Sequence, residues 1–214
     1  MEKGEGAVAM DVECFSKLGT EQLQQGYMQR ALEAFTNAYK SSQALGNHGY
    51  MQRACAFNLG ALLLSMGRFN DGVHYLSLAK PNEGCKDGKS NGDLYFNFGL
   101  AYEGLKDNAE SRRYFERALG EYRSERSNIK MEADTTRRIG HLCVNSGQFA
   151  EAEVWIKQLI QAYESLGDKE SRLQAEAERA HLLLKMGRVE EAEEIADDCL
   201  KSAKAMVSAR IGKR

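Results

Sequence analysis

The chain has 214 residues, of which 43% are hydrophobic and 28% are charged, and its formal net charge is −2. This near-balance argues against a general nucleic-acid-binding protein, because such proteins usually carry a basic stripe. No apolar run approaches the roughly 20 residues that a membrane-spanning helix requires, and the start at Met1 does not resemble a signal peptide. We therefore expect a cytoplasmic or nuclear protein that binds neither nucleic acid nor a membrane.

The rare residue types support the same class of protein. The single proline, Pro81, is compatible with long uninterrupted helices, since a proline inside a helix costs roughly 3 kcal/mol. The five cysteines lie far apart and none has the CxxC spacing of a metal or redox site. Reduced thiols are therefore expected, with Cys143 and Cys199 at positions that face the core.

The first predicted element after a small, charged N-terminus is a pair of amphipathic helices, near residues 10–25 and 28–44. Gly26 marks the tight turn between them. A small residue in the middle of the first helix, Gly19, allows the second helix to approach closely. Because one such pair cannot bury its apolar face alone, further copies are expected.

Four more copies follow in register, at a period of about 40 residues. The small residue of the first helix recurs as Gly19, Gly60, Gly99, Gly140 and Ala180. The turn position recurs as Gly26, Gly67, Lys106, Gly147 and Gly187. The second helices then carry a small residue, at Ala31, Gly72, Ser111, Ala152 and Ala192, and one turn later a residue that is apolar in each copy, at Phe35, Leu76, Phe115, Ile156 and Ala196.

These copies predict an all-α protein made of stacked helix-turn-helix repeats. The expected organisation is a disordered N-terminus at 1–9, repeats at about 10–47, 50–81, 93–123, 129–167 and 170–206, and a basic tail at 207–214. A loop rich in glycine, with the proline at its start, separates the second repeat from the third. The first repeat should end at Leu45-Gly46-Asn47 and the fourth at Leu166-Gly167-Asp168, because glycine or asparagine can adopt the left-handed conformation that ends a helix.

The repeated pattern resembles the tetratricopeptide repeat. In the first copy the resemblance rests on Phe15, Leu18, Gly19, Gly26, Ala31, Phe35 and Ala38, and in the third on Tyr95, Gly99, Tyr102, Phe115 and Ala118. The longer period and the LGN and LGD endings are most similar to the Pins/LGN subfamily. The segments ACAFNLGALLLSMG and DLYFNFGLAYEGL also look like sequences of the tetratricopeptide repeat protein 24 type. The resemblance implies a right-handed α-solenoid of five repeats.

In this family the first helices line a concave groove that binds extended peptides. The resemblance places ten residues there: Lys17, Phe57, Asn58, Phe96, Asn97, Leu100, Arg137, Arg138, His141 and His181. Asn58 and Asn97 occupy equivalent positions on adjacent first helices, about 10 Å apart by ordinary helix packing. An extended peptide rises about 3.3 Å per residue, so the two amides could bond its backbone at points three residues apart. The phenylalanines and Leu100 would accept apolar side chains, and Lys17, Arg137 and Arg138 would favour acidic ones. The alternative is that the two asparagines only bond neighbouring helices.

The fifth copy departs from the pattern at Arg179, where the other copies have Leu18, Leu59, Phe98 and Ile139. An unpaired buried arginine would be costly. Two interpretations follow from this residue. The fifth repeat is a cap with a wetter outer face, or the chain has been cut from a longer array.

No constellation for catalysis stands out. His141 and His181 lie one repeat apart, but no further ligand joins them at metal-binding spacing. Residues 84–90 resemble a phosphate loop that is one residue short and follows no strand. We therefore predict a non-enzymatic adaptor, without cofactor or metal, that binds an extended, partly acidic peptide of a partner protein. The first alternative is a self-associating scaffold, a homodimer joined through an exposed end repeat, and the remote one is an enzyme or nucleotide-binding protein.

Overall fold

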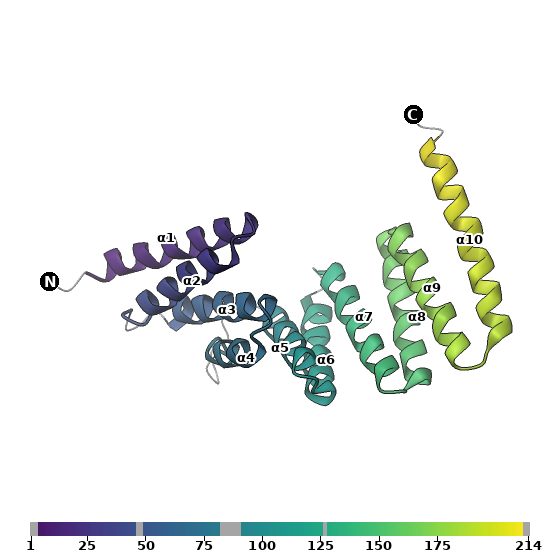
Figure 1. Ribbon diagram of the computed structural model, residues 1–214, viewed down its shortest axis with the longest axis horizontal. Coiled ribbons are helices and arrows are strands. Elements are labelled where there is room, and N and C mark those ends of the chain that lie inside the picture. Colours follow the sequence, from purple (N-terminus) through teal and green to yellow (C-terminus); the bar gives the residue numbers. More distant parts are fainter. Residues whose placement is uncertain (1–3, 46–48, 82–90, 126–127, 212–214) are drawn as a thin grey trace. The chain divides into compact units, whose positions relative to one another are not determined.

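The computed structural model describes residues 4–45, 49–81, 91–125 and 128–211, and these segments form ten α-helices and no strand (Figure 1). The helices are α1 (Glu5–Gln24), α2 (Met28–Ser42), α3 (Gly49–Ser65), α4 (Phe69–Leu78), α5 (Gly92–Gly104), α6 (Asn108–Glu125), α7 (Ile129–Asn145), α8 (Phe149–Leu166), α9 (Lys169–Lys185) and α10 (Val189–Ile211). They follow one another as five helix-turn-helix pairs, as the sequence predicted.

The chain divides into two compact units, residues 1–114 and 115–214, and the boundary lies within α6. In the first unit, α1 packs on α2, α2 on α3, α3 on α4, and α5 contacts both α3 and α4. In the second unit, α7 packs on α8, α8 on α9, and α9 on α10. Each unit therefore repeats the same contact, in which a helix packs against the next one in the chain.

The turn position is in the left-handed region in all five pairs. The φ angles are 82° at Gly26, 74° at Gly67, 73° at Gly147 and 76° at Gly187. Lys106 adopts the same conformation, with φ 64°, although a side chain makes it unfavourable. Gly167, with φ 67°, ends α8 in the same way. The repeat geometry therefore determines the backbone at these turns, and glycine is the residue that adopts it without strain.

Two of the small residues of the first helices, Gly19 and Gly60, have the predicted role, whereas a Cβ atom added to Gly140 would make only ordinary contacts, 3.5 Å from Trp155 and 3.8 Å from Ile156. A Cβ atom added to Gly19 would lie 2.6 Å from the ring of Phe35, and one added to Gly60 would lie 3.0 Å from Leu76. These contacts join the small residue of one helix to the apolar residue predicted for its partner. A larger residue would push the two helices apart.

The apolar positions form the core of each unit. Leu59, Leu76 and Phe98 are almost fully buried in the first unit, and Ile139 and Leu159 in the second. The ends of the repeat array differ from this pattern. Leu18, which is equivalent to Leu59, is 42% exposed, because among the described residues α1 has a neighbouring repeat on one side only. On α10, Ala196 is exposed and Cys199 is half-buried, so the core position predicted for this cysteine is only partly occluded.

Two predicted boundaries are wrong. Residues 5–9 are helical, since α1 begins at Glu5, and Val8 and Ala9 pack against the core of the first unit. Helix α10 continues to Ile211, so most of the predicted basic tail belongs to the fifth repeat. The phosphate-loop-like residues 84–90 and the predicted helix stop at 46–47 lie outside the described residues. In the part of the chain that is described, no helix is long and apolar enough to span a membrane.

Candidate functional site

In the first unit, the two asparagines predicted to bond a peptide backbone lie on α3 and α5. Asn58 and Asn97 are both half-buried, and α3 contacts α5. The Nδ2 atom of Asn97 donates a hydrogen bond of 2.8 Å to the carbonyl oxygen of Asp93, one turn earlier in the same helix. This bond occupies one of the two N–H groups of the amide. Binding a peptide through that group would require the Asn97 side chain to change rotamer.

The other predicted residues of the first unit divide into core and surface. Phe57 and Leu100 are half-buried and pack against the core, and Phe96 is also half-buried. Lys17 on α1 is exposed. The apolar residues expected to accept peptide side chains thus also support the fold, and each offers only part of its surface to a ligand.

In the second unit, the first helices α7 and α9 border a pocket of about 380 Å³. The pocket brings together His141 and His181, which the sequence placed at equivalent positions. Its apolar lining comes from Val144, Ile156, Ala177 and Leu182, and its polar lining from His141, Gln174, Glu178, His181 and Lys185. No three His, Cys, Asp or Glu side chains in the described segments are arranged to hold a metal ion. Both histidines lie in the wall of this pocket.

Glu178 is the one acidic residue among the described residues that line this pocket, and the side chains of Arg137 and His141 approach it. Arg137 Nη1 lies 3.4 Å from Oε1, and His141 Nε2 lies 3.7 Å from Oε2. The second distance is too long for a hydrogen bond, and the buried Oε2 atom accepts none within the described structure. Burial acts to raise the pKa of Glu178, but His141 and Arg137 hold it below its ordinary value. The carboxylate is thus charged, with acceptor capacity left on one oxygen.

Arg137 is engaged by its own chain. In addition to the Glu178 contact, its Nη2 donates a 3.4 Å hydrogen bond to the Tyr163 hydroxyl, and its guanidinium lies 5.6 Å from the centre of the same ring. Arg138, one residue later, is exposed. Of these two predicted peptide-binding arginines, only Arg138 presents its side chain largely to solvent.

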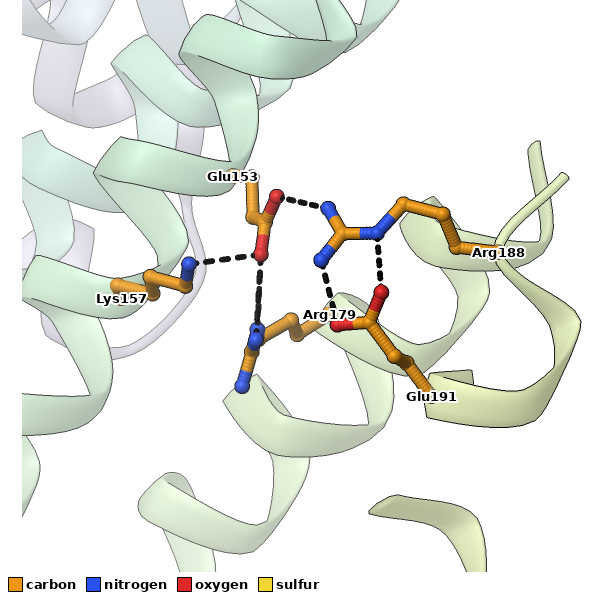
Figure 2. Close-up of polar contacts among 5 residues, drawn as sticks. All are labelled: Glu153, Lys157, Arg179, Arg188 and Glu191. Atoms are coloured by element: carbon orange, nitrogen blue, oxygen red, sulfur yellow. Dashed lines mark hydrogen bonds and ion pairs between the residues drawn. The ribbon is translucent and has the colours of Figure 1, made fainter. Parts of the chain in front are cut away.

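An ionic cluster around the buried Glu153 joins the fourth and fifth repeats (Figure 2). Glu153 on α8 is 6% exposed. One of its oxygens accepts from Lys157 at 2.8 Å and Arg179 at 3.1 Å, and the other accepts from Arg188 at 2.6 Å. Arg188 also donates to Glu191 through two nitrogens. Hydrogen bonding to Lys157, followed by Arg188 and Arg179, outweighs burial and lowers the pKa of Glu153 to about 2.

This cluster explains the unusual Arg179. The arginine is paired with a buried carboxylate, so the cost expected for an unpaired buried cation does not arise. The arginine is therefore a contact between repeats and gives no evidence of a wetter outer face.

Comparison with known proteins supports the repeat assignment. Residues 92–124, which include α5 and most of α6, match the family model described as tetratricopeptide repeat. This segment is therefore similar to a tetratricopeptide repeat. Among solved structures, tetratricopeptide-like repeats of a putative kinesin light chain from Podosopora anserina match with a TM-score of 0.74 and 14% identity, covering 96% of this chain and 99% of that one.

Two further structures have the same fold. MamA matches with a TM-score of 0.70 and 15% identity, covering 94% of this chain and 96% of that one. A Rap protein complexed with Competence and Sporulation Factor matches with a TM-score of 0.63 and 17% identity, covering 91% of this chain and 54% of that one. These similarities confirm an all-α, tetratricopeptide-like solenoid of about five repeats.

Within this tetratricopeptide-like array, the sequence interpretation missed Glu153. The position of Glu153 gave no clear signal, because its equivalents are Leu32, Val73, Arg112 and Glu193, two of which are charged. The signal was Arg179, which stands where the other four copies are apolar. A partly buried arginine at such a position predicts a carboxylate within its reach.

Proposed function

We propose that this protein is a non-enzymatic scaffold whose first helices bind an extended, partly acidic peptide segment of a partner protein. The observation that carries the proposal is the 380 Å³ pocket bordered by α7 and α9. It lies beside His141 and His181, residues that the resemblance to the tetratricopeptide repeat assigns to the ligand-binding face. A pocket with an apolar floor and a few polar groups at its margin is typical of a site that recognises side chains.

The residues around the pocket indicate what it would accept. Ile156, Leu182 and Ala177 all line the pocket, the first two as buried residues and Ala177 as an exposed one. An apolar side chain that enters the pocket would contact these residues in place of water, which is favourable. Lys185 and Gln174 are exposed polar groups of the lining and could bond the peptide beyond that side chain. We infer an apolar anchor residue flanked by polar or acidic residues.

The preference for acidic residues rests on exposed cations. Lys17, Arg138 and Lys185 are exposed, and Arg137 contacts Glu178. An acidic side chain of the partner would gain a charge-assisted bond at such a cation, while Glu178 would repel it locally. The expected ligand is therefore mixed in charge, with its acidic residues away from Glu178.

In the first unit, Asn58 and Asn97 would bond the peptide backbone, in the manner that resemblance to the Pins/LGN subfamily suggests. The half-buried amides are consistent with this role, provided that Asn97 releases Asp93. The Rap protein complex supports the general idea, because a protein of similar fold was solved with a bound factor. A scaffold of this kind would act in the cytoplasm or nucleus.

The proposal can be tested by selecting peptides from a displayed library on the intact protein and measuring their affinity by calorimetry. Ala177→Arg should fill the pocket and weaken a selected peptide at least tenfold. The paired change Asn58→Ala with Asn97→Ala should weaken it by roughly 1–3 kcal/mol for each bond lost. Val154→Arg is the matched control, since Val154 is 54% exposed on α8, a second helix.

The outcomes separate the site from nonspecific binding. Unchanged helicity with reduced affinity in the first-helix variants alone would support the proposal. Selection of no peptide, or peptides whose affinity falls only with Val154→Arg, would contradict it.

A further inference from the structure

Helix α10 has two apolar stripes, and only one of them is covered by the described chain. Ala192 and Ile195 belong to the stripe that packs against Ala180 and Leu183 of α9. The second stripe contains three large exposed residues: Val189 at 48%, Leu200 at 54% and Val207 at 56%. Ala196 and Ala203 complete it, at the three- and four-residue spacing of a helix face. An outer face of this kind is unusual for a helix in contact with water only.

The charges of α10 are segregated along its length. Residues 190–198 contain six carboxylates and no cation, whereas residues 201–211 contain cations and no carboxylate. Four exposed members of this series follow one edge of the outer stripe, again at spacings of three and four: Glu193, Asp197, Lys201 and Lys204. The edge of the stripe is thus acidic in its first half and basic in its second half.

We propose that the outer stripe of α10 pairs in antiparallel orientation with α10 of a second copy of this chain. An antiparallel two-fold pair places the same edge of both helices side by side, running in opposite directions. Glu193 and Asp197 of one copy then face Lys201 and Lys204 of the other. A parallel two-fold pair would instead place the two charged edges on opposite sides of the interface, where their opposite charges would not meet.

The apolar residues of the stripe fit the same arrangement. Leu200 lies near the middle of α10 and meets Leu200 of the second copy close to the two-fold axis. Ala196 then lies near Ala203 of that copy, and Val189 lies about one helical turn beyond the level of its Val207. The small residues flank the central leucines and allow the helices to approach closely. The helix therefore complements itself both in charge and in apolar pattern.

This inference does not depend on the peptide-binding proposal. The stripe belongs to a second helix and contains no residue of the pocket bordered by α7 and α9. The sequence analysis gave a homodimer joined through an end repeat as an alternative, and the outer stripe of α10 would be the surface of that homodimer. The interface is limited to one helix from each copy, so a reversible dimer is expected.

Sedimentation of the intact protein at low salt, over a wide range of concentration, tests the pairing. The wild type should change from monomer to dimer as concentration rises, and Leu200→Glu should raise the dissociation constant at least tenfold. Val154→Glu, at a site of the same 54% exposure on α8, is the matched control and should leave the dimer unchanged. Circular dichroism would verify that each variant keeps its helices.

Charge reversal tests the orientation. The variant Lys201→Glu with Lys204→Glu, and the variant Glu193→Lys with Asp197→Lys, should each lose the homodimer. Mixed together, they should form a heterodimer with wild-type affinity. A wild type that stays monomeric at all concentrations, a dimer insensitive to Leu200→Glu, or a mixture that fails to associate would each overturn the proposal.

Discussion

The two units of this protein use the same repeat but hold it together differently. In the first unit, contacts near α5 are aromatic: the Phe98 ring stacks on Tyr114 at 4.8 Å between centroids, and the Lys80 ammonium lies 4.6 Å from the Phe98 ring. In the second unit, the contact between α8 and the last repeat includes Glu153 and its three cations. The repeat pattern thus leaves the chemistry of each contact open, and the two units should respond differently to mutation and pH.

The largest effect is expected in the aromatic contact of the first unit. Phe98 is 1% exposed, so Phe98→Ala should destabilise that unit by about 3–5 kcal/mol through lost burial and a residual cavity. Urea unfolding combined with hydrogen exchange at α5 would measure the change. Leu78→Ala, at a residue 44% exposed, is the control and should change stability by no more than about 0.5 kcal/mol. Equal losses from both variants would contradict the burial of Phe98.

In the second unit, Glu153→Gln should destabilise the last repeat by about 2–3 kcal/mol, because three cations would lose their common carboxylate. The effect is placed below that of a fully buried pair since Arg179 and Arg188 are partly exposed. Denaturant unfolding followed by exchange at α9 and α10 would detect it. Glu194→Gln, at an exposed residue of α10, serves as the control. Faster hydrogen exchange in the first unit alone would contradict this prediction.

The pH response should distinguish the units as well. The pKa of Glu153 is about 2 in the folded chain against an ordinary value of 4.5. A carboxyl group whose pKa is lowered by folding stabilises the folded state at pH values above its pKa in the unfolded chain. This stabilisation is lost as the pH falls from 4.5 towards 2. Exchange in α9 and α10 should therefore accelerate over that range. In Glu153→Gln the Glu153 contribution to this pH dependence should be absent, and an unchanged acid profile in the variant would count against the cluster.

The smallest effect concerns the one turn without glycine. Lys106 has φ 64°, a conformation that costs a non-glycine residue roughly 1 kcal/mol. Lys106→Gly should therefore stabilise the third repeat by about 0.5–1 kcal/mol, measurable as a rise in melting temperature. Gly147→Ala, at the equivalent turn of the fourth repeat, should act in the opposite direction. A loss of stability in Lys106→Gly would show that the lysine side chain makes a contact worth more than the strain.

What the sequence by itself determined is the repeated, local part of the structure. The five turns, including Lys106, and the close approach of Phe35 to Gly19 follow from spacing, because each depends on residues within one helix pair. The class of fold follows for the same reason, since five copies in register predict that helix pairs stack. For the proposed peptide-binding face, the sequence predicted which positions belong to it but not the contacts that their side chains make.

The tertiary structure alone decided how the long polar side chains are used. Arg179 finds Glu153 twenty-six residues away, and Arg137 finds Glu178 and Tyr163 in neighbouring helices. The amide of Asn97 turns back to its own helix. Such choices depend on rotamers and on the distance between neighbouring helices, which side-chain spacing along one chain does not contain. Burial then determines how much each ion pair contributes to stability, because a charge removed from water is costly unless another group pairs with it.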